Sequence, residues 1–131
     1  HKKFYYYLEN SKEFTNLLFK ITKNLNYKFY STATSYAKEG SYLIPHIDSV
    51  YNSDSVKMLN MIFFVDGGSV PSKSGGTGIY EDADFKKPLL LPQCLKNSVL
   101  IYNSKNHFYH GFDVMTKNTF RHAITFQFIK E

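Results

Sequence analysis

His46 and Asp48 stand one residue apart in the segment LIPHIDS, residues 43–49. If this segment forms a β-strand, positions i and i+2 point to the same face, so an imidazole nitrogen and a carboxylate oxygen project side by side. These groups are two of the three ligands of a facial metal triad. The alternative is an exposed His–Asp pair on a solvated strand, because H-x-D is a short pattern that arises easily by chance.

A third ligand must come from a distant part of the chain. His110 is the favoured candidate because Gly111 follows it and leaves room near a metal. His107 is the second candidate, whereas His122 adjoins Arg121 in a predicted strand and therefore points to the opposite face. Two histidines and one carboxylate suit non-haem Fe(II). A hydrolytic zinc site with the same ligands would also need a nearby general base.

Arg121 is the only arginine among the 16 lysines and arginines of the chain. A guanidinium offers a planar fork of N–H donors that binds a carboxylate through two hydrogen bonds, which lysine cannot reproduce. Iron chemistry needs an electron-donating cosubstrate. We therefore expect Arg121 to hold the carboxylate of such a cosubstrate at the back of the pocket, although a single arginine can also be retained by chance.

The composition predicts one domain, residues 1–131, with a substantial core, because 43% of the residues are hydrophobic and 18% are aromatic. The net charge is +5, but the lysines are scattered, so a nucleic-acid partner is not expected. No apolar run approaches the roughly 20 residues that cross a bilayer. A single cysteine, Cys94, excludes an internal disulfide and favours a reducing, cytoplasmic compartment. Nothing in the sequence indicates an oligomeric state.

The first part of the chain predicts a helix. Residues 4–8 (FYYYL) favour a short strand or an extended lead-in, and Asn10 or Ser11 is the expected N-cap of a helix over about residues 11–24. The apolar face of this helix follows the helical period and is expected to pack in the core. Its members are Phe14, Leu17, Leu18, Ile21 and Leu25.

After the helix, the hydrophobic period becomes two, which predicts strands. In the strongest of them, Asn60, Ile62 and Phe64 share one face. The polar loops 51–55 and 66–77 are expected to border a substrate channel. The pattern is typical of a mostly β domain, a β-sandwich or jelly roll with an N-terminal helix packed on one sheet. The eight predicted strands are 27–37, 42–50, 56–65, 78–81, 87–91, 97–103, 107–114 and 119–129.

Several short motifs, taken in order, carry a family resemblance. They are Tyr36, PHID at 45–48, GG at 75–76, HG at 110–111 and RHAIT at 121–125. This series resembles the 2-oxoglutarate/Fe(II)-dependent dioxygenases, and most of all their prolyl-hydroxylase branch, over about residues 30–130. The resemblance implies a double-stranded β-helix, a variant of the jelly roll. It also implies an enzyme that hydroxylates a peptide, for example at proline, or a small molecule, with release of succinate and CO2.

The resemblance also implies roles for individual residues. His46, Asp48 and His110 would bind Fe(II), and Arg121 would pair with the distal carboxylate of 2-oxoglutarate. Tyr36 stands where prolyl hydroxylases often place a pocket tyrosine. The other cosubstrate would be O2, with ascorbate as an additional candidate cofactor.

The sequence departs from the family at Phe64, where related enzymes often carry a tyrosine that helps the arginine. We expect Asn60, Thr125 or a water molecule to supply the missing hydrogen bond. Asp48 argues against the halogenating relatives, which lack this carboxylate. The alternatives are a non-catalytic jelly-roll module that binds a carbohydrate or a protein partner, and a degenerate or zinc-bound relative that acts as an interaction domain.

Overall fold

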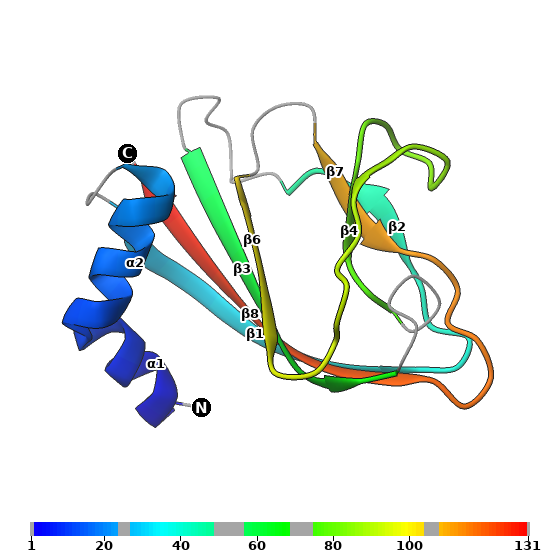
Figure 1. Ribbon diagram of the computed structural model, residues 1–131, viewed down its shortest axis with the longest axis horizontal. Helices are drawn as coiled ribbons and strands as arrows, with labels where there is room; N and C mark the ends of the chain where they lie inside the picture. The colour runs from blue at the N-terminus through cyan, green and yellow to red at the C-terminus, as the bar shows by residue number, and fades with distance from the viewer. Residues whose placement is uncertain (1, 24–26, 49–56, 69–74, 104–107, 131) are drawn as a thin grey trace.

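The computed structural model describes residues 2–23, 27–48, 57–68, 75–103 and 108–130. Within these residues, two helices precede eight strands (Figure 1). The helices are α1 (Lys2–Asn10) and α2 (Lys12–Thr22). The strands are β1 (Lys28–Lys38), β2 (Leu43–His46), β3 (Lys57–Gly67), β4 (Gly78–Tyr80), β5 (Pro88–Leu90), β6 (Ser98–Asn103), β7 (Tyr109–Phe112) and β8 (Phe120–Lys130).

The strands form two four-stranded antiparallel sheets. The first sheet has the order β1-β8-β3-β6, and the second has the order β2-β7-β4-β5. Figure 1 shows the long strands of the first sheet on the left, with the shorter strands of the second sheet on the right. The mostly β architecture with two antiparallel sheets, expected from the sequence, is confirmed.

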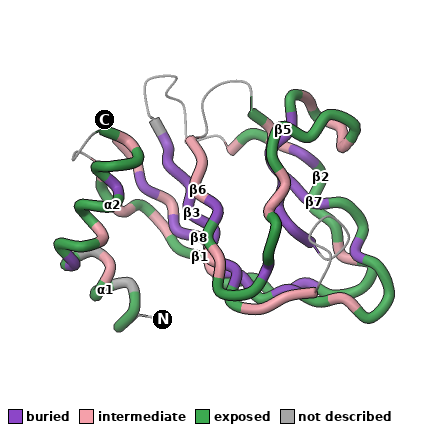
Figure 2. The backbone as a smooth tube through the Cα atoms, viewed as in Figure 1, coloured by how far each residue is buried: buried purple, intermediate pink, exposed green. Residues whose placement is uncertain are grey.

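The long strands of the first sheet have two different faces. Ile62 and Phe64 of β3 pack with Ile79 of β4, so this inner face meets the second sheet. Met61 and Phe63, at the alternate positions, belong to a separate cluster on the outer face. The predicted division of β3 into two faces is therefore correct, and Figure 2 shows the buried stretches along these strands.

Helix α2 begins where the sequence predicted. The Oγ of Ser11 accepts a hydrogen bond from the backbone N–H of Phe14 at 3.1 Å, so Ser11 is the N-cap. Leu18 is buried against the outer face of the first sheet, with Phe14 beside it. The apolar face is narrower than predicted, because Leu17 and Ile21 are 45% and 47% exposed. Leu25 lies outside the described residues.

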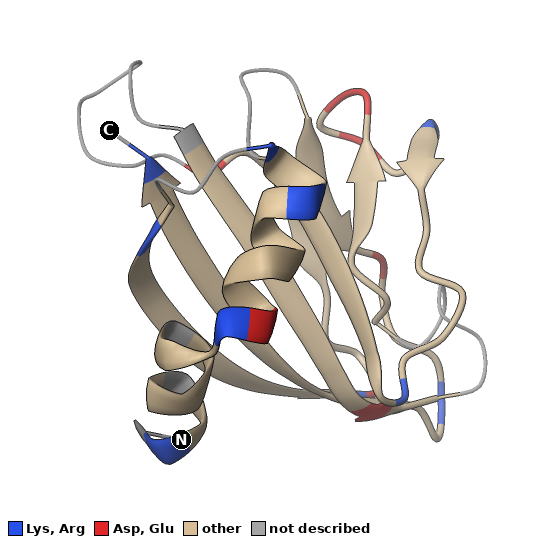
Figure 3. Ribbon diagram, turned by 60° about the vertical axis from the view of Figure 1, so that its left-hand side comes forward, with Lys and Arg blue, Asp and Glu red and all other residues tan. Residues whose placement is uncertain are grey.

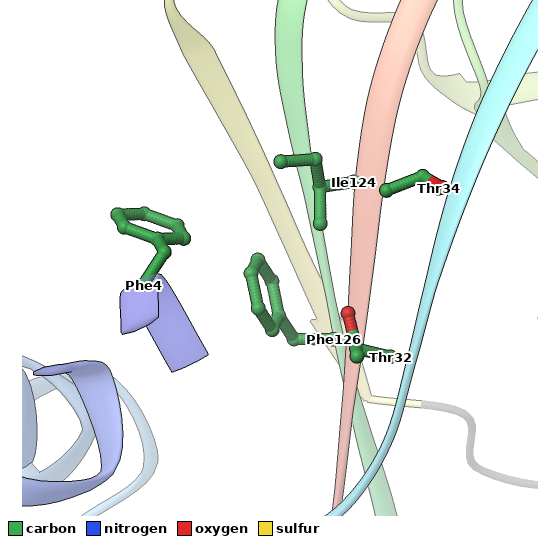
Figure 4. Close-up of a pocket in the computed structure, with 5 residues that line it drawn as sticks. All are labelled: Phe4, Thr32, Thr34, Ile124 and Phe126. Carbon is green, nitrogen blue, oxygen red and sulfur yellow. The ribbon is translucent and has the colours of Figure 1, made fainter. Parts of the chain in front are cut away.

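Residues 4–8 form part of helix α1, so the prediction of a strand or an extended lead-in was wrong. The helix places Phe4 and Leu8 on one face, four residues apart, where both meet the outer face of the first sheet. The ring of Phe4 lies 5.9 Å from that of Phe126. Tertiary packing thus overrides the local β preference of the aromatic run. A pocket of about 270 Å³ lies between α1 and the sheet (Figure 4).

The charged residues do not gather on one element. Figure 3 shows lysines on both helices and at strand ends, and acidic residues on α2, in the segment after β4 and at several other places. Among the described residues, no helix is long and apolar enough to cross a membrane.

Replacing Phe126 should test the contact between the helices and the first sheet. Phe126 is 2% exposed, so Phe126→Ala should lower the free energy of unfolding by about 3–5 kcal/mol, from lost burial and the cavity left behind. The matched control Phe19→Ala removes a ring that is 44% exposed and should cost less than about 1 kcal/mol. Urea denaturation measures both values. Equal losses would contradict the packing described here.

Candidate metal centre and anion pocket

His46 and His110 are brought together by the pairing of β2 with β7. The two residues are direct cross-strand partners in this antiparallel pair, and their ring centroids lie 4.2 Å apart. Directly opposed side chains in an antiparallel pair share a face. The register of the second sheet therefore sets the two imidazoles side by side.

Asp48 completes a group of three potential ligands. Its Oδ1 lies 3.5 Å from the Nε2 of His46 and 3.6 Å from the Nε2 of His110. The three ligand atoms lie within 4.8 Å of one another, so they could hold one metal ion. β2 ends at His46, however, so the predicted strand over 42–50 was too long. Asp48 reaches the site from the segment that follows the strand.

Gly111 allows β2 and β7 to approach this closely. A Cβ at residue 111 would lie 2.4 Å from the backbone oxygen of Leu43 and 2.9 Å from the nitrogen of Pro45. Any side chain here would push the backbone of β2 away. We expected Gly111 to leave room near the metal, whereas its close contact is with the neighbouring strand.

The two histidines are held differently. The Nδ1 of His46 lies 2.9 Å from the backbone oxygen of Ile44, so Nδ1–H donates to this carbonyl and Nε2 is the nitrogen that faces Asp48. Burial lowers the pKa of His110 to about 4; the charge of Asp48 opposes this shift and that of His46 adds to it. His110 is therefore neutral at pH 7, the form in which imidazole binds metals.

The second oxygen of Asp48 faces the first sheet. Oδ2 accepts hydrogen bonds from Asn60 Nδ2 at 2.9 Å and from Gln127 Nε2 at 3.3 Å. Ser31 donates in turn to the Oε1 of Gln127. The carboxylate of Asp48 thus lies between two histidines of one sheet and two amides of the other.

Arg121 lies on the inner face of β8 and is only 5% exposed. Its Nη1 donates to the backbone oxygen of Gly75 at 2.6 Å and to the Oγ1 of Thr77 at 2.8 Å. Its Nη2 makes a longer hydrogen bond of 3.4 Å to the Oγ of Ser35. The guanidinium carbon also lies 4.5 Å from the ring centroid of Phe112.

No carboxylate among the described residues forms an ion pair with Arg121. Its Nε is buried and has no hydrogen-bond partner among them. Burial lowers the pKa of Arg121 to about 10, a shift that Tyr102 partly opposes, so the guanidinium stays charged at pH 7. A buried charge without a counter-charge is costly, and an anionic ligand would relieve that cost.

One cavity of about 170 Å³ connects these groups. It is smaller than the roughly 300–1,000 Å³ of pockets for drug-sized ligands, so it suits a small metabolite. Its lining residues come from both sheets and include members of the triad as well as the guanidinium. They are Ser31, Ala33, Leu43, Asp48, Ile62, Thr77, Tyr102, His110, Arg121, Thr125 and Gln127.

Tyr102 of β6 contributes a half-buried phenol to this cavity. Its ring centroid lies 5.1 Å from that of His110. Burial raises the pKa of Tyr102 above its usual range, and the charge of Asp48 adds to the shift, while a hydrogen bond with Asn60 and the charge of Arg121 oppose it. The phenol therefore keeps its proton and can donate a hydrogen bond to a ligand oxygen.

Tyr36 does not line the cavity, contrary to the prediction from the sequence. It is 60% exposed and pairs with His122 across β1 and β8, with the two rings 4.7 Å apart. Its neighbour Ser35 points inward to Arg121, so the alternation of β1 turns Tyr36 to the outer face. The separation of ten residues between Tyr36 and His46 did not predict the face of Tyr36, because a turn lies between β1 and β2.

The other predicted residues have different outcomes. Thr125 lines the cavity, as expected, whereas Asn60 contacts Asp48 rather than Arg121. Phe64 is 1% exposed, and its ring centroid lies 5.7 Å from the guanidinium carbon of Arg121.

Parts of the prediction cannot be placed. His107 and loop 51–55 lie outside the described residues, as do residues 69–74 of the second loop. His122 faces away from the cavity, as predicted.

Several polar residues of the site escaped the sequence analysis. Gln127 and Arg121 stand six residues apart in β8, so the alternation of a strand places both on one face. The same rule relates Ser31 to Ser35 in β1. Only the long-range pairing of β1 with β8 reveals that these two rows share one cavity, and no local motif marks Thr77 or Tyr102.

Neither a scan against protein-family models nor a search of curated proteins finds a match for this chain.

Replacing Gly111 should separate the two histidines. Gly111→Ala should lower stability by about 1–3 kcal/mol through overpacking. Because β2 must also move, the mutation should weaken metal binding about tenfold or more. Isothermal titration with Co(II) measures the affinity.

Gly40→Ala provides the control for Gly111→Ala. Gly40 has a φ of +80°, and its Cβ would meet nothing within 4 Å, so alanine is strained there but touches no strand. We expect a loss of about 1–2 kcal/mol in stability and an unchanged metal affinity. If Gly111→Ala also kept the wild-type affinity, the close approach of β2 to β7 would not be needed for the site.

Proposed function

We propose that this protein is a non-haem Fe(II), 2-oxoglutarate-dependent dioxygenase that hydroxylates an organic substrate. One observation carries the proposal: a buried arginine, which has no acidic partner among the described residues, shares a small cavity with a His–Asp–His group. The first feature suits a carboxylate ligand, and the second suits a divalent cation with open coordination positions. A 2-oxo dicarboxylate is small enough for the cavity. Its distal carboxylate would bind the arginine, and its 2-oxo acid end would bind the cation.

The strand order supports the jelly-roll variant that this class of enzyme uses. β1 pairs with β8, β2 with β7, β3 with β6, and β4 with β5. This is the pattern of one long hairpin, with its tip between β4 and β5, that is wound into two sheets. The winding explains how His46 and His110, 64 positions apart in the numbering, become neighbours.

The donor set fits Fe(II). A cation bound at about 2.0–2.2 Å from three ligands at right angles would separate the ligand atoms by about 3 Å. The observed separations of 3.5 Å and 3.6 Å from Asp48 Oδ1 require only a small contraction. When bound, Fe(II) supplies the one-electron chemistry that couples decarboxylation of 2-oxoglutarate with O2, giving succinate and CO2, to hydroxylation of the substrate.

Arg121 would orient the cosubstrate. Its Nη1 is already occupied by Gly75 and Thr77, which leaves the edge formed by Nε and Nη2 for a carboxylate. Two parallel N–H donors on this edge match the two oxygens of a carboxylate. The hydroxyls of Thr77 and Ser35 fix the plane of the guanidinium, so little freedom is lost when the ligand binds.

The substrate is proposed to be a peptide, for example one containing proline, or a small molecule. The alternative, a non-catalytic jelly-roll module for a carbohydrate or protein partner, gives no role to the buried cation of Arg121. A zinc-bound relative would keep the triad, but Zn(II) has a filled d shell and no redox chemistry, so it would give neither a charge-transfer band nor succinate. Anaerobic addition of Fe(II) and 2-oxoglutarate distinguishes these functions, because only the dioxygenase should give a visible charge-transfer band and, with O2, succinate.

Substituting Arg121 should weaken 2-oxoglutarate binding. Lysine keeps the charge but cannot serve Gly75, Thr77 and a carboxylate together, so Arg121→Lys should cost about 1.5–3 kcal/mol of binding free energy. Titration of the charge-transfer band gives the affinity. Lys87→Met, which removes an exposed positive charge, is the control and should have no effect. Unchanged affinity in Arg121→Lys would show that another residue holds the carboxylate.

Removing the carboxylate of Asp48 should abolish the metal centre. Asp48→Ala leaves only the two imidazole ligands and should eliminate the charge-transfer band and succinate formation. Asp113→Ala removes an exposed aspartate near the end of β7 and should keep both signals. Iron-dependent hydroxylation by Asp48→Ala would mean that the ligands are assigned incorrectly.

A further inference from the structure

We infer that Asn60 and Gln127 are positioning residues that hold Asp48 so that a single oxygen of its carboxylate meets the metal. The inference rests on the proposed function and extends it to two residues of the first sheet. Both amides donate to Oδ2 of Asp48, at 2.9 Å and 3.3 Å. Oδ1, the other oxygen, is the one that faces His46 and His110.

The orientation of the Gln127 amide is fixed by its other contacts. The carboxylate of Asp48 can only accept, so the Nε2 end of Gln127 faces it, and Oε1 then accepts a hydrogen bond from the hydroxyl of Ser31 of β1. The same Nε2 also lies 3.4 Å from the sulfur of Met58. An amide held at both ends can keep a carboxylate in one rotamer.

Asn60 is held even more firmly. It is fully buried at 0% exposure, in the middle of β3, where the backbone leaves its side chain little freedom. A hydrogen bond links it to Tyr102 on the adjacent strand β6. Tyr102, Asn60 and Asp48 therefore form a chain of polar contacts that leads from the cavity wall to the metal ligand.

Asp48 needs this support because it lies beyond the end of β2. Strand pairing places His46 directly, because His46 pairs with His110. This is the last register pair of β2, so Asp48 lies beyond the paired residues. A carboxylate that is free to rotate can bind a cation through both oxygens and so occupy one more coordination position. A chelating 2-oxo acid and O2 together need every position that three protein ligands leave on an octahedral ion. Donors on Oδ2 keep that extra position open.

Binding of Co(II), which takes the same ligands as Fe(II) and has an absorption spectrum that depends on coordination number, tests the inference. Gln127→Met and Asn60→Leu keep the approximate size of each side chain and remove the N–H donors. Each should lower the Co(II) affinity about 10–100-fold. Each should also change the intensity and shape of the visible Co(II) bands, because Oδ2 loses one of its two donors and can turn toward the metal more easily.

Thr32→Val is the matched control. The hydroxyl of Thr32 bonds to the backbone of Thr125, and its side chain lies on the outer face of β1, next to Ser31. Its loss should leave the affinity and the spectrum unchanged. Circular dichroism establishes that each variant is folded; if Asn60→Leu does not fold, Gln127→Met alone decides the test.

Two results would overturn the inference, and they are distinguishable. Folded variants that bind Co(II) with wild-type affinity and spectrum would exclude a positioning role and leave the proposed function intact. A variant with lower thermal stability but an unchanged Co(II) spectrum would likewise reduce the amides to structural residues. Failure of the wild-type protein to bind Co(II) would overturn the proposed function itself, and this inference with it.

Discussion

The buried positive charge of Arg121 is the constraint around which the interior is arranged. A guanidinium with 5% exposure has lost most of its hydration, and folding must compensate for this loss. The compensation comes from neutral groups: a carbonyl, two hydroxyls and the faces of two aromatic rings. Neutral partners stabilise the cation without cancelling its charge. The positive potential therefore remains in the cavity, where a ligand can use it.

Gly75 is part of the same arrangement. Its φ is +82°, and a Cβ there would lie 2.8 Å from the sulfur of Met115 and 3.2 Å from Cδ of Arg121. Its carbonyl can therefore reach Nη1 only because the residue has no side chain. The GG motif contributes through backbone geometry rather than through a phosphate-binding loop, which agrees with the absence of any surrounding nucleotide-binding pattern in the sequence.

The two sheets make unequal contributions to the site. The second sheet supplies the imidazoles through the pairing of β2 with β7, while the first sheet supplies Arg121 and the amides that bind Asp48. Asp48 is the contact between them. The site is therefore complete only at one separation of the sheets, and the core between Ile62, Phe64 and Ile79 sets that separation. The packing of the core between the sheets therefore also determines whether the groups of the site can meet.

The sequence predicted the strands and their faces well, because the hydrophobic period that indicates them is a local property. The period of two located the eight strands, and the faces of β3 followed directly from it. The prediction failed where a distant contact decides the outcome. Residues 4–8 became helical because the outer face of the first sheet offers them a partner, and Tyr36 turned outward because the pairing of β1 with β8 fixes its face.

The loss of a tyrosine hydroxyl at Phe64 illustrates how the cavity can keep its polarity by other means. A phenylalanine ring near the guanidinium supplies dispersion and an electrostatic contact with the ring face, but no hydrogen bond. Hydroxyls reach the same cation from Thr77, which directly precedes β4 of the second sheet, and from Ser35 in β1 of the first sheet. Tyr102 adds a phenol that keeps its proton to the lining of the same cavity. The polar groups around the cation are thus distributed over several strands, and no single position in the sequence could have revealed them.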